Sequence, residues 1–267
     1  MIGIRLLWHT ISVEGDGDVV TSLAELLPQA EHPMPPVRAM AYRVDAVESG
    51  YLVREEGDLL AHAPSVEAAR DEMYVRMHRR AFEFASLAGW VRVHCVTVDI
   101  GRARLLIAGS SGVGKTTLAL RMLADGLDVQ GDESALVRAG ASLAVPRPFQ
   151  VKEGTRDLVP DLADLLDRLP QVHDVRVLDP ATVRSPWRLV EAPITHIVVL
   201  ERTNGTVSCE RAAAVDVLEV LVRDSFVVTE SKSALIGTLS AAARAGGYRL
   251  TTGDPGRMVE ELRRLVQ

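Results

Sequence analysis

One eight-residue stretch constrains this chain more than any other: Gly109-Ser110-Ser111-Gly112-Val113-Gly114-Lys115-Thr116. It fits the pattern G-x-x-x-x-G-K-[ST], in which a glycine-rich loop joins a strand to a helix and surrounds phosphate groups with backbone amides. The flanks agree with this pattern, because residues 104–108 form an apolar run of strand length and residues 117–124 are rich in helix formers. Asp125-Gly126 then marks the end of the helix. The sequence therefore predicts a P-loop between a strand and a helix.

The chemistry of such a loop follows from its residue types. Glycines let the backbone turn tightly and bring successive N–H groups onto phosphate oxygens, and the new helix adds its positive end. Lys115 is expected to reach the β- and γ-phosphates, and the Thr116 hydroxyl group to bind Mg²⁺. ATP and Mg²⁺ are therefore the predicted cofactors. The residues predicted to bind the nucleotide are Gly109, Ser110, Ser111, Gly112, Val113, Gly114, Lys115, Thr116 and Thr117.

Composition narrows the class of partner. Of the 267 residues, 47% are hydrophobic and 25% charged, which is the balance of a folded globular protein. A net charge of −6 argues against binding to nucleic acid, since phosphate backbones favour a basic surface. The two cysteines form no metal-binding spacing, and no apolar run approaches the ~20 residues that span a bilayer. We therefore expect a cytoplasmic protein with no membrane partner; homo-oligomerisation is left open.

The first 90 residues predict a small α+β region. A strand is expected at 4–11, a short helix at 20–27, and an antiparallel meander of strands at 39–47, 51–54 and 59–63 separated by turn residues. A long helix is expected from 64 to about 87, ended by Gly89. Met73, Met77, Ala81 and Phe84 fall on one face of that helix, a pattern typical of core packing.

The remaining residues predict a nucleotide-binding region. A strand at 91–98 precedes the P-loop strand, and short strands are expected at 127–130, 134–138 and 141–145. A nearly continuous apolar strand at 195–200, two amphipathic helices, a strand at 248–251 and a closing helix at 255–266 follow. We therefore expect two domains: residues 1–90 as an α+β domain for acceptor or partner recognition, and residues 91–267 as the P-loop domain.

Charged residues near the ends of predicted strands are the candidates for chemistry. Asp132-Glu133 lies 16 residues past Thr116, where one carboxylate could take a proton from an attacking hydroxyl group and the other could help to hold Mg²⁺. A solvent-exposed turn is the alternative explanation for this acidic pair. Three basic side chains could supply positive charge to a transferred phosphoryl group, although each is also typical of a surface position: Arg147, Lys152 and Arg202. His94, taken alone, reads as a structural histidine.

The order of these features resembles the catalytic core of bacterial HPr kinase/phosphorylase. That family also has a histidine opening a strand, a P-loop of the Ser-Gly-x-Gly-Lys type and an acidic pair about 17 residues past its lysine. The resemblance covers residues 93–133 and continues more loosely to the end of the chain. It implies an α/β fold of the HPr kinase/phosphoenolpyruvate carboxykinase type, with a mixed sheet. By the resemblance, Asp132 is the general base, Glu133 and Asp132 assist Thr116 at the metal, and His94 becomes a candidate active-site residue.

This chain also departs from the family pattern. Its acidic pair is Asp-Glu instead of Asp-Asp, and Asp125-Gly126-Leu127 replaces the family's Arg-Gly-His approach to that pair. No counterpart of the family's C-terminal glycine- and arginine-rich signature is present, and residues 1–90 do not resemble its regulatory domain. These differences argue against HPr as the acceptor and against phosphorylase activity. Relatives of this kind phosphorylate free serine, sugars or peptides, and the sequence does not choose among them.

Two functions from different classes remain. The first is an ATP- and Mg²⁺-dependent kinase that transfers the γ-phosphate to a hydroxyl group of a small molecule or peptide, with Asp132 as the base. The second is a nucleotide-binding regulatory module with little or no phosphotransfer. An Asn-Lys-x-Asp motif, as in GTPase switches, and a Leu-Ser-Gly-Gly signature, as in ABC ATPases, are both missing from the sequence. The kinase is the leading prediction.

Overall fold

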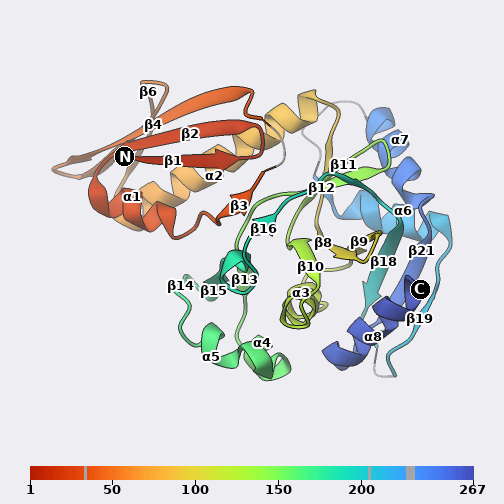
Figure 1. The fold of residues 1–267 in the computed structure, drawn as a ribbon. Helices are drawn as coiled ribbons and strands as arrows, with labels where there is room; N and C mark the ends of the chain where they lie inside the picture. The colour runs from red at the N-terminus through yellow and green to blue at the C-terminus, as the bar shows by residue number, and fades with distance from the viewer. Residues whose placement is uncertain (33–34, 204–205, 227–231) are drawn as a thin grey trace.

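The computed structural model describes residues 1–32, 35–203, 206–226 and 232–267. It is a mixed α/β structure with several sheets (Figure 1). The strand order is β1-β2-β4-β5-β6 in the N-terminal sheet, β10-β8-β9-β18-β21-β19 in the central sheet and β17-β12-β11-β7-β20 in a third sheet. Among the described residues, no helix is both long enough and apolar enough to cross a membrane.

The N-terminal sheet confirms the predicted meander and corrects the strand before it. Its strands are β1 (Ile2–Leu6), β2 (His9–Gly15), β4 (Arg38–Val47), β5 (Gly50–Glu55) and β6 (Asp58–Ala63), and β4, β5 and β6 pair antiparallel in sequence order. The single strand predicted at 4–11 is wrong, because the chain reverses at Leu7-Trp8, where Leu7 has a φ of 52°. Helix α1 (Gly17–Ala24) starts earlier than predicted, because the Asp16 carboxylate accepts hydrogen bonds from its first-turn amides.

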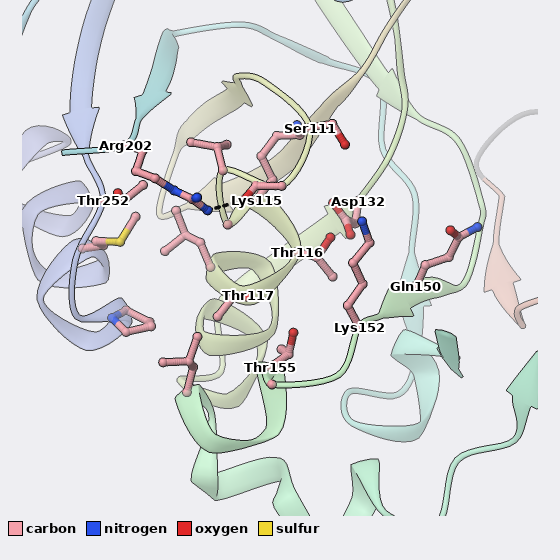
Figure 2. Close-up of a pocket in the computed structure, with 18 of the residues that line it drawn as sticks. Ser111, Lys115, Thr116, Thr117, Asp132, Gln150, Lys152, Thr155, Arg202 and Thr252 are labelled. Carbon is pink, nitrogen blue, oxygen red and sulfur yellow. Dashed lines mark hydrogen bonds between the residues drawn. The ribbon is translucent and has the colours of Figure 1, made fainter. Parts of the chain in front are cut away.

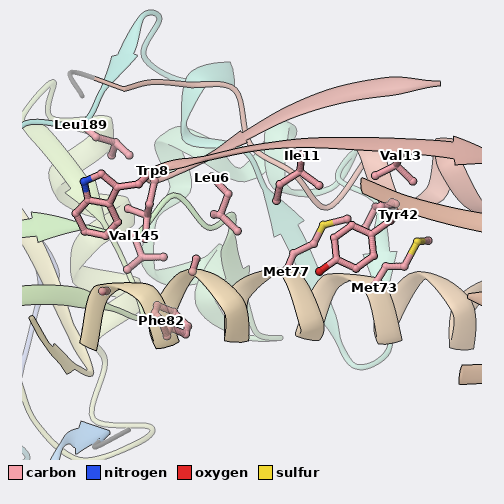
Figure 3. Close-up of a cluster of buried hydrophobic side chains, with 14 of the residues drawn as sticks. Leu6, Trp8, Ile11, Val13, Tyr42, Met73, Met77, Phe82, Val145 and Leu189 are labelled. Atoms are coloured by element: carbon pink, nitrogen blue, oxygen red, sulfur yellow. The ribbon is translucent and has the colours of Figure 1, made fainter. Parts of the chain in front are cut away.

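Helix α2 (Val66–Leu87) follows the prediction closely and packs on the N-terminal sheet. Ser65 caps its first turn, and Met73, Met77 and Ala81 are fully buried against residues such as Ile11 and Tyr42 (Figure 3). The same hydrophobic cluster also contains residues from beyond position 90: Leu136, Leu143, Val145, Trp187 and Leu189. The predicted domains thus share buried contacts, while their division at residue 90 stays a prediction.

The central sheet has a helical layer on each face. Its strands are β8 (Cys95–Ile100), β9 (Ala103–Ala108), β10 (Asp128–Gly131), β18 (His196–Glu201), β19 (Cys209–Arg211) and β21 (Gly247–Thr251). Leu105 and Ile107 of β9 pack in one hydrophobic cluster with α3 (Lys115–Ala124) and α8 (Pro255–Leu265). The alternating Leu106 packs in another cluster with α6 (Ala214–Arg223) and α7 (Lys232–Ala243). Burial on both faces explains the continuous apolar runs of these strands.

Strand direction places several loops at one edge of the central sheet. Strands β9, β18 and β21 are parallel, so their carboxyl ends lie together. Strand β8 is antiparallel to both β9 and β10, so the start of β8 and the end of β10 reach the same edge. In open α/β sheets, ligands bind outside the carboxyl ends of parallel strands. The P-loop and the acidic pair both lie at this edge.

The predicted strand at 91–98 is divided between two sheets at His94. Strand β7 (Val91–Val93) pairs with β11 (Ala135–Arg138) and β20 (Ser225–Phe226), and β11 continues to β12 (Ala141–Ala144) and β17 (Ala192–Pro193). The other elements are β3 (Ala30–Glu31) with β16 (Trp187–Arg188), β13 (Phe149–Val151), β14 (Gln171–Val172) and β15 (Val175–Leu178), the short helices α4 (Thr155–Leu158) and α5 (Ala163–Leu166), and the 3₁₀ turns Pro160–Leu162 and Pro180–Thr182.

Candidate functional site

A cavity of about 850 Å³ lies at the carboxyl edge of the central sheet. The ends of four strands contribute to it: the P-loop after β9, Asp132 after β10, Arg202 after β18 and Thr252 after β21 (Figure 2). Lys152 and Gln150 approach from β13 and the turn after it, on the opposite wall. The lining includes most of the residues predicted from sequence: Ser111, Gly112, Val113, Gly114, Lys115, Thr116, Thr117, His94, Asp132, Glu133, Lys152 and Arg202.

The P-loop backbone requires glycine at its start and at its junction with α3. Gly109 has a φ of 152°, and a Cβ atom there would lie 2.7 Å from the carbonyl oxygen of Leu200. Gly114, with a φ of 110°, is the residue before α3, and no side chain among the described residues caps that helix. The first-turn N–H groups of α3 therefore remain available to an anion at its positive end. Gly109 and Ser110 are part of the loop but do not line the cavity.

Lys115 is folded back onto the loop that precedes it. Its ammonium group is buried and donates hydrogen bonds to the carbonyl oxygens of Gly109 at 2.6 Å and Ser110 at 3.2 Å. Burial lowers the pKa of Lys115, while the charges of Asp224 and Asp132 act in the opposite direction. These contacts are with backbone carbonyls and not with the hydrophobic core. The side chain of Lys115 therefore places a positive charge at the loop and does not contribute to core packing.

Asp132 is a buried carboxyl group facing the start of α3. It is 1% exposed, and its Oδ2 atom has no hydrogen-bond partner among the described residues. Burial raises the pKa of Asp132 to about 6, the neighbouring Thr116 hydroxyl group lowers it, and the charge of Glu133 raises it. Figure 2 shows the Thr116 side chain directed toward this carboxyl group. The solvent-exposed turn considered from the sequence does not describe Asp132.

Glu133 and His94 are connected through the backbone. Glu133 has a φ of 78°, a left-handed conformation that is uncommon for a residue other than glycine. Its carbonyl oxygen accepts a hydrogen bond from Nδ1 of His94 at 2.7 Å, which leaves Nε2 of a neutral imidazole as an acceptor. Both residues line the cavity. Strained backbone of this kind is concentrated at functional sites, so the bend at Glu133 favours a functional role for the acidic pair.

The three predicted cations are not equivalent. Lys152 and Arg202 line the cavity, and Arg202 donates a hydrogen bond to the carbonyl oxygen of Gly112 at 2.7 Å. Arg147 does not line it. Its guanidinium group donates to the Tyr74 hydroxyl group at 3.2 Å and lies 3.8 Å from a carboxylate oxygen of Glu133. Arg147 therefore lies between the acidic pair and helix α2.

Sequence reasoning missed other residues at this edge. The Asp224 carboxylate accepts a hydrogen bond from the Gly109 amide at 3.2 Å, and its main-chain carbonyl accepts one from the His94 amide at 2.7 Å. No local pattern marks Asp224, because the bond to Gly109 spans 115 residues of chain. Thr252 could have been found, since it lies just beyond the predicted strand at 248–251 of a sheet with one ligand-binding edge. Gln150 lies on β13, a strand of another sheet that the sequence analysis does not predict.

Comparison with known proteins gives little further information. No family model matches this chain, and none of the curated proteins matches it. Among solved structures, the Hpr(Ser) kinase/phosphatase from Coxiella burnetii is similar, with a TM-score of 0.37 and 9% sequence identity. That similarity covers 66% of this chain and 95% of the other.

Proposed function

We propose that this protein is an ATP- and Mg²⁺-dependent kinase that transfers the γ-phosphate to a hydroxyl group of a small molecule or peptide, with Asp132 as the general base. The observation that carries the proposal is a buried carboxyl group, with one unpartnered oxygen, next to the hydroxyl group of a P-loop threonine. A carboxylate that ligates Mg²⁺ would serve a nucleotide-binding module as well, so the proposed role of Asp132 as a base is what distinguishes the kinase from that module.

Nucleotide binding is supported by the loop geometry. The uncapped start of α3 and the left-handed glycines suit an anion, and the ammonium group of Lys115 is within the loop. In this role Lys115 leaves its backbone carbonyls and contacts the β- and γ-phosphates. Arg202, Thr252 and Met258 line the cavity beyond the P-loop and would contact the remainder of the nucleotide.

The proton acceptor is assigned from burial and pKa together. A general base works best when its pKa is near the working pH, and burial brings the pKa of Asp132 to about 6. In the proposed step, the acceptor oxygen forms a bond to the γ-phosphorus, its proton passes to the Asp132 carboxylate, and the bond from phosphorus to the β–γ bridging oxygen breaks. The products are ADP and a phosphate ester. Lys115 and Lys152 stabilise the charge on the transferred group.

The residues present fit a magnesium ion. Within the described part of the chain, no group of three or more His, Cys, Asp or Glu side chains could enclose a metal. Mg²⁺ at phosphoryl-transfer sites needs fewer protein ligands, because one or two carboxylates, substrate phosphates and water complete its shell. The unpartnered Oδ2 atom of Asp132 and the neighbouring Thr116 hydroxyl group provide that smaller set, with Glu133 next to them. When bound, the ion would neutralise charge on the β- and γ-phosphates.

The test is Asp132→Asn, which keeps the shape of the side chain and removes the base. We expect transfer of labelled phosphate from ATP to an acceptor, found by screening serine, sugars and hydroxyl-bearing peptides, to fall by about 10²–10⁴-fold in kcat. The dissociation constant for ATP should stay close to that of the wild type. Asp157→Asn is the matched control, because the Asp157 side chain is 79% exposed. Unchanged transfer in Asp132→Asn removes Asp132 as the base, and tight ATP binding with no acceptor at all favours the regulatory module.

A further inference from the structure

Two arginines lie between helix α2 and the acidic pair. Arg147, on the segment between β12 and β13, donates its Nε hydrogen bond to Tyr74 of α2, and its Nη1 atom is 3.8 Å from Glu133. Its side chain is 16% exposed. Arg92, on β7, donates its Nε hydrogen bond to the hydroxyl group of Ser134 at 3.0 Å. The two residues that follow Asp132 therefore each contact one arginine.

The guanidinium group of Arg92 lies against two aromatic rings. Its central carbon is 4.2 Å from the ring centroid of Phe82 on α2 and 4.5 Å from that of Phe226 on β20. Stacking of this kind holds the plane of the group fixed and leaves its Nη edge for hydrogen bonding. No carboxylate forms an ion pair with Arg92 in the described ranges. A fixed guanidinium edge without a carboxylate partner is a geometry that suits an oxyanion.

The two arginines belong to one cluster of charges with the acidic pair. His78, which lies on α2 between Tyr74 and Phe82, is neutral, because burial and the charges of the two arginines lower its pKa to about 3. Burial and the charge of Arg147 lower the pKa of Arg92 to about 10. Glu133, at 3.8 Å from Arg147, is the carboxylate paired with this cluster among the described residues. The charge of Asp132 also acts on Arg147, so the acidic pair offsets much of this positive charge. Arg92 has no ion pair in the described ranges, and an anion at its Nη edge would offset its repulsion from Arg147.

We propose that Arg92 and Arg147 form the acceptor subsite and hold a carboxylate or phosphate group of the hydroxyl-bearing substrate. The subsite rests on the proposed kinase function, because it borders the proposed base. Asp132 contacts Thr116 of the P-loop helix, while Glu133 and Ser134 contact the arginines. Asp132 and Glu133 line the cavity, and the two arginines lie directly behind them without lining it. The proposal therefore requires the oxyanion of the acceptor to reach the arginines beside Glu133, one residue from the base. The acceptor class is then a small hydroxy acid or a hydroxyl-bearing phosphate ester, instead of a neutral sugar.

The test measures binding with the P-loop filled. The protein is saturated with Mg²⁺ and a non-hydrolysable ATP analogue, which occupies the γ-phosphate position, and is titrated by calorimetry with three probes: D-glycerate, glycerol 3-phosphate and glycerol. We expect at least one anion to bind about 10- to 100-fold more tightly than glycerol. The better anion identifies the carboxylate or the phosphate as the group recognised. Equal binding of all three probes overturns the subsite.

Variants locate the binding. Arg92→Gln and Arg147→Gln should each remove the preference for the anion while the affinity for the ATP analogue is retained, and Arg92→Lys should restore it only in part, since lysine lacks the planar fork. Arg138→Gln is the control. Arg138 also stacks on an aromatic ring, with its guanidinium carbon 4.3 Å from the ring centroid of Trp90. Its side chain is 44% exposed, and its polar contacts are with Ala88 and Glu191 instead of the acidic pair. A retained preference in both glutamine variants overturns the proposal. If the wild-type protein shows no preference for the anions and phosphorylates a neutral acceptor, the substrate class is overturned and the kinase proposal stands. If the wild-type protein binds the anions but phosphorylates no acceptor, the kinase proposal is overturned and the anion site stands.

Discussion

The two sides of the acidic pair are built in different ways. On the P-loop side, the groups available to a ligand come from one contiguous stretch and are largely backbone amides, with Lys115 and Thr116 at its end. On the α2 side, they are side chains from separate elements: Tyr74 and Phe82 on α2, Arg92 on β7, Arg147 after β12 and Phe226 on β20. A contiguous backbone motif can be recognised in a sequence, whereas a side-chain cluster exists only once distant elements meet. The two sides should therefore respond differently to substitution.

Lys115→Ala should have the largest effect on nucleotide binding. Removing the ammonium group should lower ATP affinity or turnover by about 10²–10³-fold, since a charged donor to the transferred phosphate is lost. The fold should persist, because Lys115 contacts backbone carbonyls, and circular dichroism with nucleotide titration checks both points. Arg121→Ala is the control, because Arg121 lies on the same helix and pairs with Asp125 and Asp161. If ATP binding and turnover match the wild type, the P-loop assignment is wrong.

Asp132→Asn should also stabilise the ligand-free protein, in a pH-dependent way. The pKa of Asp132 is about 6 in the folded state against an ordinary 3.8, so the folded state holds this proton more tightly. Below pH 4 the carboxyl group is protonated in both the folded and the unfolded state, so it does not lower the free energy of unfolding. Between pH 4 and 6 the unfolded state loses this proton first, and the free energy of unfolding falls. Above pH 6 the full destabilisation by the buried charge is present. The variant should raise the free energy of unfolding by about 3 kcal/mol at pH 7.

Chemical denaturation at pH 7 and at pH 4 measures this difference. The increase in the free energy of unfolding caused by Asp132→Asn should shrink toward zero at pH 4. Asp157→Asn, at an exposed position, should show neither this increase nor its pH dependence. An equal loss of stability at both pH values would mean that Asp132 has a structural role. A gain in stability at pH 7 alone would instead show that the wild-type carboxyl group destabilises the fold, as is typical of residues kept for function.

Thr116→Ala should change the metal requirement before it changes the fold. If the hydroxyl group is a magnesium ligand, half-maximal activity should need about tenfold more Mg²⁺, or about 1.4 kcal/mol of binding. Thr116→Ser is the control, since it keeps the hydroxyl group and should behave like the wild type. Titrating Mg²⁺ at fixed ATP distinguishes the two variants. An unchanged requirement in Thr116→Ala would assign the metal to other groups.

Tyr74→Phe gives the smallest expected effect and tests the α2 side. It removes the acceptor of the Arg147 hydrogen bond, which should cost about 1 kcal/mol and raise the KM for an anionic acceptor about fivefold. The ATP affinity should not change. Tyr51→Phe is the matched control, because Tyr51 lies on β5 of the N-terminal sheet and does not line the cavity. A loss of ATP affinity in Tyr74→Phe would show that the two sides are not separate.

The contrast between local motifs and tertiary contacts also explains which parts of the fold can be predicted from the sequence. Helix α2 was predicted almost to its ends, because Ser65 and Gly89 mark them and Met73 and Met77 define its buried face. The reversal at Leu7-Trp8 was missed, because no glycine, proline or asparagine marks it; Trp8 instead packs on Phe84 and Trp90, with ring centroids 5.7 and 6.0 Å away. Elements specified by local signals can be predicted, and elements specified by tertiary contacts cannot.

The candidate site divides along the same line. The P-loop residues could be named because the chemistry of phosphate binding dictates adjacent residue types. Asp132 could be suggested from its distance along the chain, but its burial and its position beside Thr116 required the fold. The charge of Arg147 predicts a role at the transferred phosphate, whereas its contacts are with Tyr74 and Glu133. Nothing near Arg92 in the chain distinguishes it from a surface arginine.

Asp224 provides a second connection between the P-loop and the acidic pair, besides the contact of Thr116 with Asp132. Its side chain holds the amide that begins the P-loop, and its main-chain carbonyl holds the amide of His94, whose ring in turn contacts Glu133. It is also the residue directly after α6, so the end of that helix is hydrogen-bonded to the start of the phosphate loop and to the segment that carries His94. One residue therefore fixes the position of α6 relative to both parts of the site.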